Sequence, residues 1–513
     1  MTDVPTTPSR QRWMAAMVAL TLLVFLCQSA SASGTGKPNI IILFADDLGY
    51  GDLGSYGHPY NRTPNLDQLA AEGQRWTDFY VAAPVCSPSR GALLTGKYPT
   101  RSGLYGRQIN VLFPNDSVGM PAAERTLPEA LKEQGYATAI IGKWHLGDAP
   151  DVLPTRHGFD EWYGLPYSND MDWVGEPDFD AMVALRAQGR LQELQASVDG
   201  RLAKYFDPKV DYWNVPLLRS RCVDGRCEDT IVERPAQQPE LTKRYTSEAL
   251  AFIDRNRRRP FLLYLPYSMP HTPIFRSDAF ARRSLGGRYG DVIEELDWSV
   301  GAIVERLKAL GIDRRTLVLF TSDNGPWRYM REHAGSAGLL LRDGKGTTFE
   351  GGQRVPAIFW GPGRVKPQVV SELGTALDVY ATALALAGAA PTPDIDGLDL
   401  SAVLRDGRAS PRATFAYYRS GELRAFRKGR FKLHLILEGA YGLPPGRTVP
   451  ETPVLYDLSV DPGEQFDVAA RYPDVVTDIL REIDRHRAGL VEQPPLFDQR
   501  LARLAARPAS EGG

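Results

Sequence analysis

Asn39-Ile40-Ile41-Ile42-Leu43-Phe44-Ala45 is continuously apolar after its first residue, and Asp46-Asp47 follow it directly. An unbroken apolar run of this length is typical of a strand buried on both faces, as in a parallel sheet. Ligands bind beyond the carboxyl ends of strands in open α/β sheets. The stretch therefore predicts a buried strand and, at its end, one edge of a binding site.

Helix-like and strand-like segments alternate after this run. Thr63-Pro64 opens one predicted helix, and Thr126-Leu127-Pro128-Glu129 forms a capping box at the start of another. Further helices are expected to begin near Thr246 and Asp291. Additional buried strands are expected at 137–141, 261–265 and 317–320. The alternation predicts the α/β class, with a large, mostly parallel mixed sheet and helices on both faces.

The rest of the chain suggests further divisions. The α/β domain is expected over 33–404, interrupted by a charged insertion at 173–240 that lacks long strands and shapes a pocket. Alternating polar and apolar residues predict a small antiparallel-sheet subdomain over 405–500, which ends in a helix at 472–487. Residues 501–513 are expected to form a flexible tail.

Residues 1–32 have the pattern of a secretory signal peptide. Two arginines precede an apolar core at 14–26 that is too short to span a bilayer, and Ala30-Ser31-Ala32 provides a cleavage site. The alternatives are a retained anchor and a lipid attached at Cys27, although the bulky residues 24–26 disfavour the lipid. We therefore expect export to the periplasm or the medium, with no stable membrane span.

The amino-acid composition excludes few classes of function, but the positions of the cysteines are informative. The net charge of -2 gives no argument for binding nucleic acid or a membrane. Cys222 and Cys227 are close enough in sequence to form a disulfide in an exported protein, or they are two free thiols. Cys86 then remains alone in Cys86-Ser87-Pro88-Ser89-Arg90. A lone cysteine in an exported chain indicates a reactive thiol or a processing site.

Polar clusters follow each of the predicted buried strands. Asp46 and Asp47, with Asp323 and Asn324, offer the hard oxygen ligands that Ca²⁺ or Mg²⁺ prefers. Four such clusters at four strand ends predict one shared site. The four clusters are Asp46-Asp47, Gly142-Lys143-Trp144-His145, Pro270-His271 and Ser322-Asp323-Asn324-Gly325.

On these motifs the chain resembles the type I sulfatases, formylglycine-dependent members of the alkaline phosphatase-like superfamily. Tyr167-Ser168 and the stretch 344–363 look closest to the branch of arylsulfatase A and N-acetylgalactosamine-6-sulfatase. The matching motifs are Cys86-Ser87-Pro88-Ser89-Arg90 with Leu94-Thr95-Gly96, Gly142-Lys143-Trp144-His145-Leu146-Gly147, the three other strand-end clusters, Gly344-Lys345-Gly346-Thr347 and Leu455-Tyr456-Asp457-Leu458.

The resemblance implies two cofactors. Cys86 would be oxidised to Cα-formylglycine by a formylglycine-generating or equivalent maturation enzyme, which replaces a soft thiol with oxygens suited to a hard cation. A divalent metal, usually Ca²⁺ in this family with Mg²⁺ as the alternative, would be held by Asp46, Asp47, Asp323 and Asn324 together with residue 86. Pro88 in the first turn of a predicted helix would place residue 86 at a helix N-terminus.

The resemblance also assigns roles to the other motif residues. Arg90 would orient the formylglycine, and Lys143 and Lys345 would bind the sulfate oxygens. His145 would assist release of the enzyme-bound sulfate, and His271 would protonate the leaving alcohol. Ser168 would donate a supporting hydrogen bond. His434 is expected to have a structural role instead.

We therefore interpret the chain as an arylsulfatase-like sulfuric ester hydrolase acting on a small-molecule or glycan sulfate ester. One alternative is a phosphonate or phosphate monoester hydrolase that uses the same residues. The other is a sulfated-glycan-binding protein that is never matured. Specificity is expected to depend on the insertion at 173–240 and on loops near 420–450, and the sequence assigns no oligomeric state.

Overall fold

Strand β1 (Asn39–Ala45) lies in the interior of a large mixed sheet and is completely buried. The computed structural model describes residues 36–328, 340–390 and 392–506, all but the first of them within one compact unit. β1 pairs in parallel with β7 (Phe261–Pro266) on one side and β8 (Thr316–Ser322) on the other. The apolar run is thus a buried parallel strand, as the sequence predicts.

Within the described residues this sheet has the strand order β10-β2-β9-β8-β1-β7-β3-β4-β5-β6, with β11 paired to β2. The pairs of β9 with β2 and β8, and of β5 with β4 and β6, are antiparallel, and the other pairs are parallel. The remaining strands are β2 (Gln74–Tyr80), β3 (Ala137–Ile141), β4 (Glu161–Gly164), β5 (Leu217–Val223), β6 (Arg226–Glu233), β9 (Arg354–Trp360), β10 (Gln368–Val370) and β11 (Gly374–Thr375).

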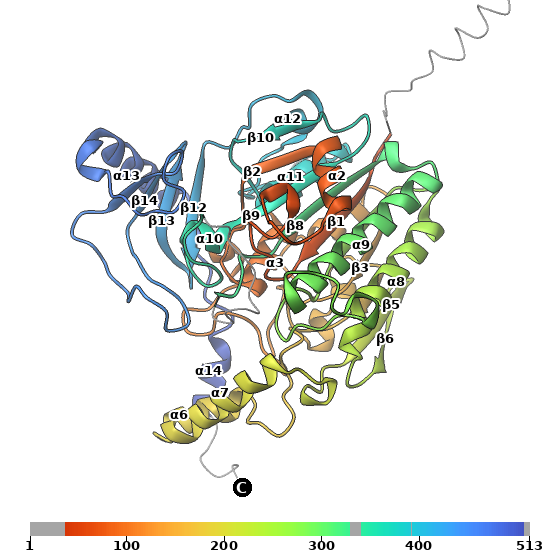
Figure 1. The fold of residues 1–513 in the computed structure, drawn as a ribbon, viewed down its shortest axis with the longest axis horizontal. Helices are drawn as coiled ribbons and strands as arrows, with labels where there is room; N and C mark the ends of the chain where they lie inside the picture. Colours follow the sequence, from red (N-terminus) through yellow and green to blue (C-terminus); the bar gives the residue numbers. More distant parts are fainter. Residues whose placement is uncertain (1–35, 329–339, 391, 507–513) are drawn as a thin grey trace, which may run out of the picture. The chain divides into compact units, whose positions relative to one another are not determined.

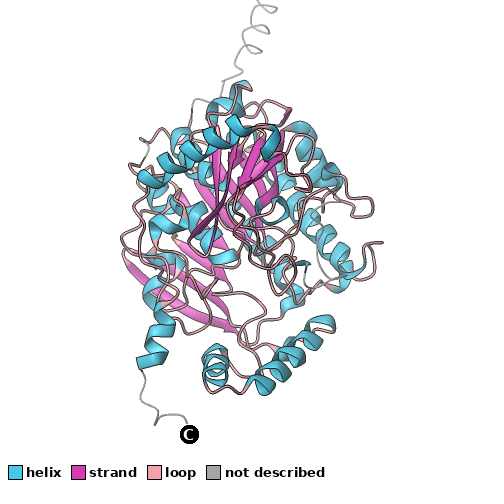
Figure 2. Cartoon of the chain, turned by 90° about the vertical axis from the view of Figure 1, so that its left-hand side faces the viewer, coloured by secondary structure: helices cyan, strands magenta, loops and turns pink. Residues whose placement is uncertain are grey.

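Helices cover both faces of the sheet (Figures 1 and 2). Alternate residues of β1 enter different cores: Ile41 packs with α2, α8 and α9, and Ile42 packs with α3, α5 and α11. Burial of both faces explains why β1 has no polar alternation. The helices are α2 (Pro64–Glu72), α3 (Cys86–Thr95), α4 (Pro99–Ser102), α5 (Leu127–Lys132), α6 (Phe179–Ala187), α7 (Leu191–Phe206), α8 (Leu241–Asn256), α9 (Gly287–Ala309), α10 (Glu350–Gln353), α11 (Ala376–Leu386), α12 (Ser401–Asp406), α13 (Pro473–Ala488) and α14 (Gln499–Ala506).

The predicted helix starts are partly right. The Thr126–Glu129 capping box opens α5 as expected. The predicted starts near Thr246 and Asp291 are wrong, because α8 and α9 begin earlier, at Leu241 and Gly287. The first turn of α8 already carries buried residues, so packing against the sheet extends the helix beyond its local signal.

The expectation that the insertion lacks long strands is wrong. β5 and β6 form a two-stranded hairpin at the edge of the large sheet. Asp224 and Gly225 at its turn both have positive φ angles, which matches the preference of two-residue hairpin turns for Asp-Gly. Cys222 and Cys227 face each other across the hairpin and form a disulfide. Most of β6 is exposed, so the hairpin lacks the apolar alternation that marks a half-buried strand.

The C-terminal part contains a second, four-stranded antiparallel sheet in the order β12-β13-β14-β15, as predicted. It packs through its own apolar cluster against α13 and against Tyr80 and Leu377 of the α/β part. A domain boundary near residue 404 remains a prediction. The strands are β12 (Thr414–Arg419), β13 (Glu422–Lys428), β14 (Phe431–His434) and β15 (Val454–Asp457).

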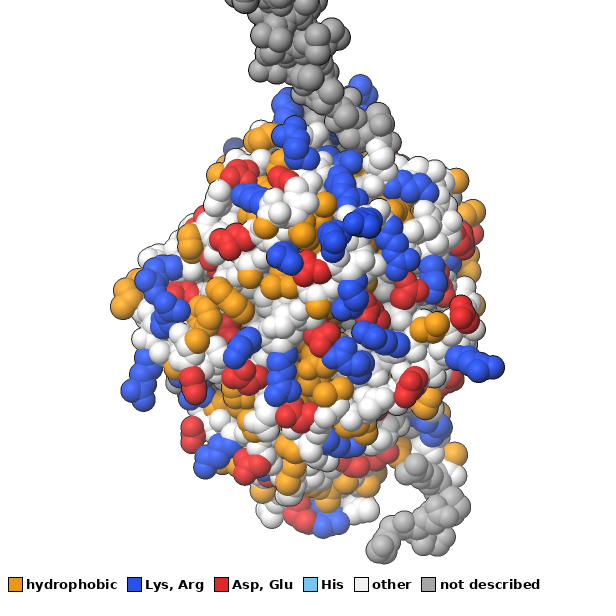
Figure 3. All heavy atoms as spheres, turned by 90° about the vertical axis from the view of Figure 1, so that its right-hand side faces the viewer, with side chains coloured by type: hydrophobic (Ala, Val, Ile, Leu, Met, Phe, Trp, Pro, Cys, Tyr) orange, Lys and Arg blue, Asp and Glu red, His pale blue; other side chains and the backbone are white. Residues whose placement is uncertain are grey.

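The surface shown in Figure 3 mixes positive and negative side chains. Among the described residues no helix is both long and apolar enough to cross a membrane. The predicted signal peptide at 1–32 lies outside the described residues, as does most of the predicted tail at 501–513.

Candidate active site

The polar clusters that follow the buried strands meet at one edge of the sheet. Asp46 and Asp47 follow β1, and His271 lies in the loop after β7. One potential metal-ligating atom from each of Asp46, Asp47, Cys86 and His271 lies within 4.8 Å of the others. The structure therefore brings together side chains that are far apart in the sequence.

Cys86 is the first residue of α3 and is buried. Its Sγ atom lies 3.6 Å from Asp46 Oδ1. Burial raises the pKa of the Cys86 thiol, and this effect outweighs the opposing influence of Lys143 and Lys345. The sulfur is thus held as a neutral thiol at the N-terminus of a helix, a position that favours an anionic ligand.

Arg90, one helical turn further along α3, joins three strand ends. Its Nη2 atom lies 2.7 Å from Asp323 Oδ2 and 3.3 Å from Asp46 Oδ1, and its Nη1 atom donates to the carbonyl of Lys143. All three of these charged side chains are completely buried. Because a buried guanidinium paired with carboxylates is costly to disturb, Arg90 fixes the base of the site.

Two lysines bind the aspartates that follow β1. Lys143 Nζ donates to Asp46 Oδ2 at 2.7 Å and to Ser168 Oγ at 3.1 Å. Lys345 Nζ donates to Asp47 Oδ2 at 2.9 Å and lies 3.0 Å from His271 Nε2. Two ammonium groups thus converge on the region around residue 86, where they can bind a tetrahedral oxyanion.

The two aspartates differ in their electrostatic surroundings. Burial raises the pKa of Asp46, but the charges of Lys143 and Arg90 outweigh it and hold the value well below the usual range. For Asp47 burial dominates over the opposing charge of Lys345 and raises the pKa to about 7. Asp46 is therefore an anion at every ordinary pH.

Both site histidines are neutral in this arrangement. Burial, reinforced by nearby lysine charge, lowers the pKa of His271 and of His145 well below the usual value. The His145 Nε2 atom lies 3.0 Å from the Leu112 carbonyl oxygen, so it carries the proton of that bond. His145 Nδ1 is buried and has no hydrogen-bond partner among the described residues, and His145 lines the pocket beside Cys86. That nitrogen is a ready proton acceptor.

Two of these side chains are oriented by an unusual backbone conformation. Asp47 and His145 have φ angles of 65° and 58°, in the left-handed region. Such conformations cost free energy and persist where the surrounding structure holds them, often at functional sites. Gly142 has a φ of 131°, and a Cβ atom there would lie 1.9 Å from the carbonyl oxygen of Pro266. Only glycine therefore fits between β3 and the end of β7.

The donor set fits a hard divalent cation. Asp46, Asp47 and Asp323 provide carboxylates, and the buried Asn324 Oδ1 atom has no hydrogen-bond partner within the part of the chain that the structure describes. Asn324 Nδ2 donates to Asp47 Oδ1 at 2.6 Å, and the Asp47 backbone N–H donates to Asp323 Oδ1 at 3.0 Å. Oxygen ligands of this kind suit Ca²⁺ or Mg²⁺. The compact ligand cluster also includes His271, for which the resemblance implied roles in catalysis and substrate binding but not in metal binding.

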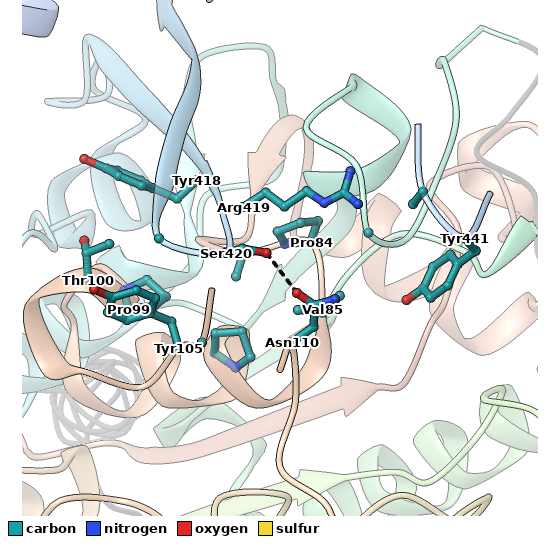
Figure 4. A pocket seen from close by; sticks show the side chains of 16 residues that line it. Pro84, Val85, Pro99, Thr100, Tyr105, Asn110, Tyr418, Arg419, Ser420 and Tyr441 are labelled. Carbon is teal, nitrogen blue, oxygen red and sulfur yellow. Dashed lines mark hydrogen bonds between the residues drawn. The ribbon is translucent and has the colours of Figure 1, made fainter. Parts of the chain in front are cut away.

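A cavity of about 430 Å³ opens above Cys86. One wall comes from the 173–240 insertion, with Trp173, Phe179 and Tyr205, and another from Tyr441 in the C-terminal part. A smaller cavity of about 70 Å³ lies beside it, where Ser420 donates to Asn110 Oδ1 at 2.9 Å (Figure 4). The insertion and the 420–450 loops therefore surround the reactive centre.

Several wall residues were not singled out from the sequence. Asp170, Trp173, Arg201 and Trp327 line the large cavity, although none belongs to a recognisable motif. Arg201 lies on α7, whereas Asp170 and Trp173 follow β4 and Trp327 follows β8. Their meeting in one cavity depends on tertiary packing, which local patterns do not reveal. His434 is buried away from the cavity walls, and its Nε2 atom lies 2.7 Å from Glu464 Oε1. This position is in keeping with the structural role expected for His434.

Family models match nearly all of the chain. The model described as "Sulfatase" matches residues 38–389, and the model described as "C-terminal region of aryl-sulfatase" matches residues 410–511. Together these matches include every motif named above.

Individual relatives agree with the family models. Arylsulfatase A of Bos taurus is 40% identical over 495 residues, covering 92% of this chain and 90% of the relative. N-acetylgalactosamine-6-sulfatase of Mus musculus is 38% identical over 509 residues, covering 92% and 91%. Among solved structures, the PsFucS1 sulfatase from Pseudoalteromonas sp. superposes with a TM-score of 0.76 and 28% identity, covering 94% of this chain and 95% of that one.

Proposed function

The chain belongs to the sulfatase family, with its alkaline phosphatase-like fold, and hydrolyses sulfate esters; we propose that Cα-formylglycine derived from Cys86 is its nucleophile. We further propose that Ca²⁺ is the resident metal, with Mg²⁺ as the alternative, held by Asp46, Asp47, Asp323 and Asn324 together with residue 86. The observation that carries this proposal is the position of Cys86, the first residue of α3, among these oxygen ligands.

The chemistry of the ligand set supports conversion of Cys86. A thiol is a soft ligand and a poor neighbour for a hard cation, whereas two geminal hydroxyls are suitable. When bound, the metal would supply Lewis acidity at residue 86, and the hydrated aldehyde would supply the attacking hydroxyl. An enzyme that oxidises Cys86 during maturation is therefore a required partner.

The other residues bind the sulfate and move protons. Lys143 and Lys345 bind the sulfate oxygens and stabilise the charge that develops on them. Arg90, which follows residue 86 on α3, orients that residue, and the Ser168 hydroxyl accepts a hydrogen bond from Lys143 Nζ. These roles require no movement of the strands, because the strand ends already bring the groups together.

The two site histidines have different hydrogen-bond partners and different proposed roles. His271 lies beside Lys345 and protonates the oxygen of the leaving alcohol. His145 presents an unpaired Nδ1 atom near residue 86 and accepts the proton whose removal releases the bound sulfate. A neutral histidine is suited to accepting a proton, and His271 becomes an acid only after taking one up.

We propose that the protein is exported, to the periplasm or the medium. The Cys222–Cys227 disulfide supports this, because disulfides persist in oxidising compartments. The pattern of residues 1–32 provides the signal, and lipid attachment at Cys27 is the alternative. The substrate is proposed to be an aryl or glycan sulfate ester, in line with the names of the two relatives.

The matches do not favour the two alternatives, a phosphonate or phosphate monoester hydrolase and an unmatured glycan-binding protein. The direct test compares 4-nitrophenyl sulfate with 4-nitrophenyl phosphate as substrates of the natively expressed protein. We expect a large preference for the sulfate and complete loss of turnover in Cys86→Ala, with an unchanged melting temperature. A preference for the phosphate, or full activity of Cys86→Ala, would contradict the proposal.

A further inference from the structure

The large cavity above Cys86 continues into a second cavity of about 290 Å³. Among the described residues that line this second cavity, Arg201 on α7 is the one with a charged side chain. Its walls are otherwise apolar or aromatic, and the Trp327 ring lies 5.4 Å from the Tyr441 ring and 6.4 Å from the Tyr205 ring. The lining residues are Val198, Arg201, Leu202, Tyr205, Trp327 and Tyr441.

Arg201 is only 7% exposed, yet it has no close negative partner among residues 36–328, 340–390 and 392–506. Its guanidinium lies 4.2 Å from the centre of the Trp173 ring, and its Nε atom donates to the Ser197 carbonyl at 3.3 Å. Its Nη2 atom lies near the sulfur of Met182. In the described part of the chain no carboxylate comes within the 4.0 Å of a salt bridge with it.

The acids nearest to Arg201 are engaged elsewhere. Asp170 accepts a hydrogen bond from the Tyr205 hydroxyl at 3.2 Å. Glu176 pairs with Lys204 at 3.0 Å and accepts from the Ser197 hydroxyl. Both carboxylates favour the positive charge of Arg201, but they act from beyond the distance of a salt bridge.

The other buried arginines of the described residues differ from Arg201, because each forms a salt bridge with a carboxylate. These are Arg90 with Asp323, Arg354 and Arg427 with Asp78, Arg412 with Asp378, Arg424 with Glu438 and Arg500 with Asp180. Burying a charge without a partner is costly. Arg201 lacks such a carboxylate among the described residues, so an anionic ligand in the cavity could act as its partner.

We propose that Arg201 binds a second anionic group of the substrate, a carboxylate or a further sulfate, on the part of the molecule that remains after the ester is cleaved. This inference rests on the proposed function, because the second cavity is reached from the pocket above Cys86. The aromatic side chains around Arg201 provide flat surfaces for a ring that carries this group. Arg201 thus selects for polyanionic substrates and takes no part in the chemistry.

The test uses six biphenyl-4-yl sulfates that differ only on the distal ring, which carries a carboxamide, a carboxylate or a sulfonate at either the 3′ or the 4′ position. In the wild type we expect kcat/KM for at least one anionic probe to exceed that for its neutral counterpart by about tenfold, the usual effect of one charge-assisted contact. The carboxylate and sulfonate arms identify which anion is preferred. Turnover of the neutral probes separately tests the proposed function.

Arg201→Gln should remove the preference while leaving turnover of the carboxamide probes within about twofold, and Arg201→Lys should keep part of the preference. Arg190→Gln, also on the insertion but exposed and paired with Glu193, is the matched control for lost charge and should retain the preference. A wild type that hydrolyses neutral and anionic probes equally well would overturn the inference. So would an equal loss on all probes in Arg201→Gln, which would make Arg201 a purely structural residue.

Discussion

The Nζ atom of Lys345 lies 2.9 Å from Asp47 Oδ2, and both side chains are buried. Lys345 reaches this carboxylate from a loop 298 residues further along the chain. The same carboxylate belongs to the compact ligand cluster proposed to hold the metal. Under the proposed function, Lys345 would therefore compete with the metal for the negative charge of Asp47 while it provides positive charge for the sulfate.

Lys345→Met should separate these two effects. Metal affinity is expected to rise several-fold, because a buried positive charge beside the ligands is removed. The value of kcat/KM for an aryl sulfate should fall by about a hundredfold, because one donor to the sulfate is lost. Calorimetric titration of metal into stripped protein and steady-state kinetics measure the two quantities.

Lys97→Met, which removes a lysine paired with Glu124, is the control. Unchanged metal affinity would show that Lys345 does not affect the ligand cluster.

His271→Ala should reduce activity most on substrates with poor leaving groups. An alkyl or sugar alcohol requires protonation as it leaves, whereas an activated phenolate requires little. We expect a loss of about a hundredfold or more on an alkyl sulfate and a much smaller loss on 4-nitrophenyl sulfate. The measurement is a plot of log(kcat/KM) against leaving-group pKa, which should become steeper in the variant. Parallel plots for wild type and variant would rule out the acid role.

Lys432 is expected to be a large contributor to stability. Its Nζ atom lies 3.0 Å from Glu350 Oε1 and 2.8 Å from Glu464 Oε1, and all three side chains are completely buried. Lys432→Met removes the cation that these two buried carboxylates share, so the free energy of unfolding should fall by roughly 3–5 kcal/mol. Glu350 keeps its contact with Arg354, and Glu464 keeps its contact with His434.

Lys428→Met is the matched control for Lys432→Met, because Lys428 on the neighbouring strand pairs with Asp478 and Glu482 at a partly exposed position. Its effect should stay below about 1 kcal/mol. Urea unfolding followed by tryptophan fluorescence compares the two variants. Similar effects in both would show that the buried cluster is worth no more than a surface pair.

His157 should make the protein less stable in acid. Burial lowers the pKa of His157 from 6.5 to about 4. Because the folded state binds this proton more weakly, the stability contribution is complete above pH 6.5 and is lost as the pH falls towards 4. His157→Phe keeps a ring beside Trp144 and cannot titrate.

Between pH 7.5 and 4.5 the unfolding free energy of the wild type should fall by roughly 2 kcal/mol more than that of His157→Phe. The comparison is His58→Phe: burial lowers the pKa of His58 as well, but this side chain is only half-buried, so the variant should stay closer to the wild type than His157→Phe does. If His157→Phe and the wild type lose the same stability, His157 is not a titrating group in this range.

Local signals were sufficient for the α/β core and its strand ends. The apolar run before Asp46 and the capping box at Thr126 depend on residues adjacent in sequence, and both appear in the structure as predicted. Because neighbouring parallel strands end at the same edge of a sheet, the clusters after β1, β3, β7 and β8 meet there. The assignment of roles within that cluster came from the family resemblance.

Features that depend on tertiary packing could not be predicted in the same way. The outer strand of the β5–β6 hairpin is mostly exposed, so it lacks the apolar alternation that predicts a strand. The Asp224-Gly225 turn is a local signal for a hairpin, but it lies in a segment that otherwise looks like a charged loop. Arg201 resembles an ordinary surface arginine in the sequence. Only the packing of α7 shows that Arg201 is buried in a cavity wall and that no described carboxylate forms a salt bridge with it.

The central claim is that Cys86 is converted to an aldehyde, and the most direct test is the mass of the tryptic peptide Trp76–Arg90 from natively expressed, active protein. We predict a peptide about 18 Da lighter than the cysteine form, reactive towards a hydrazide label, in proportion to the specific activity of the preparation. A fully active preparation whose residue 86 is an unmodified thiol would contradict the account.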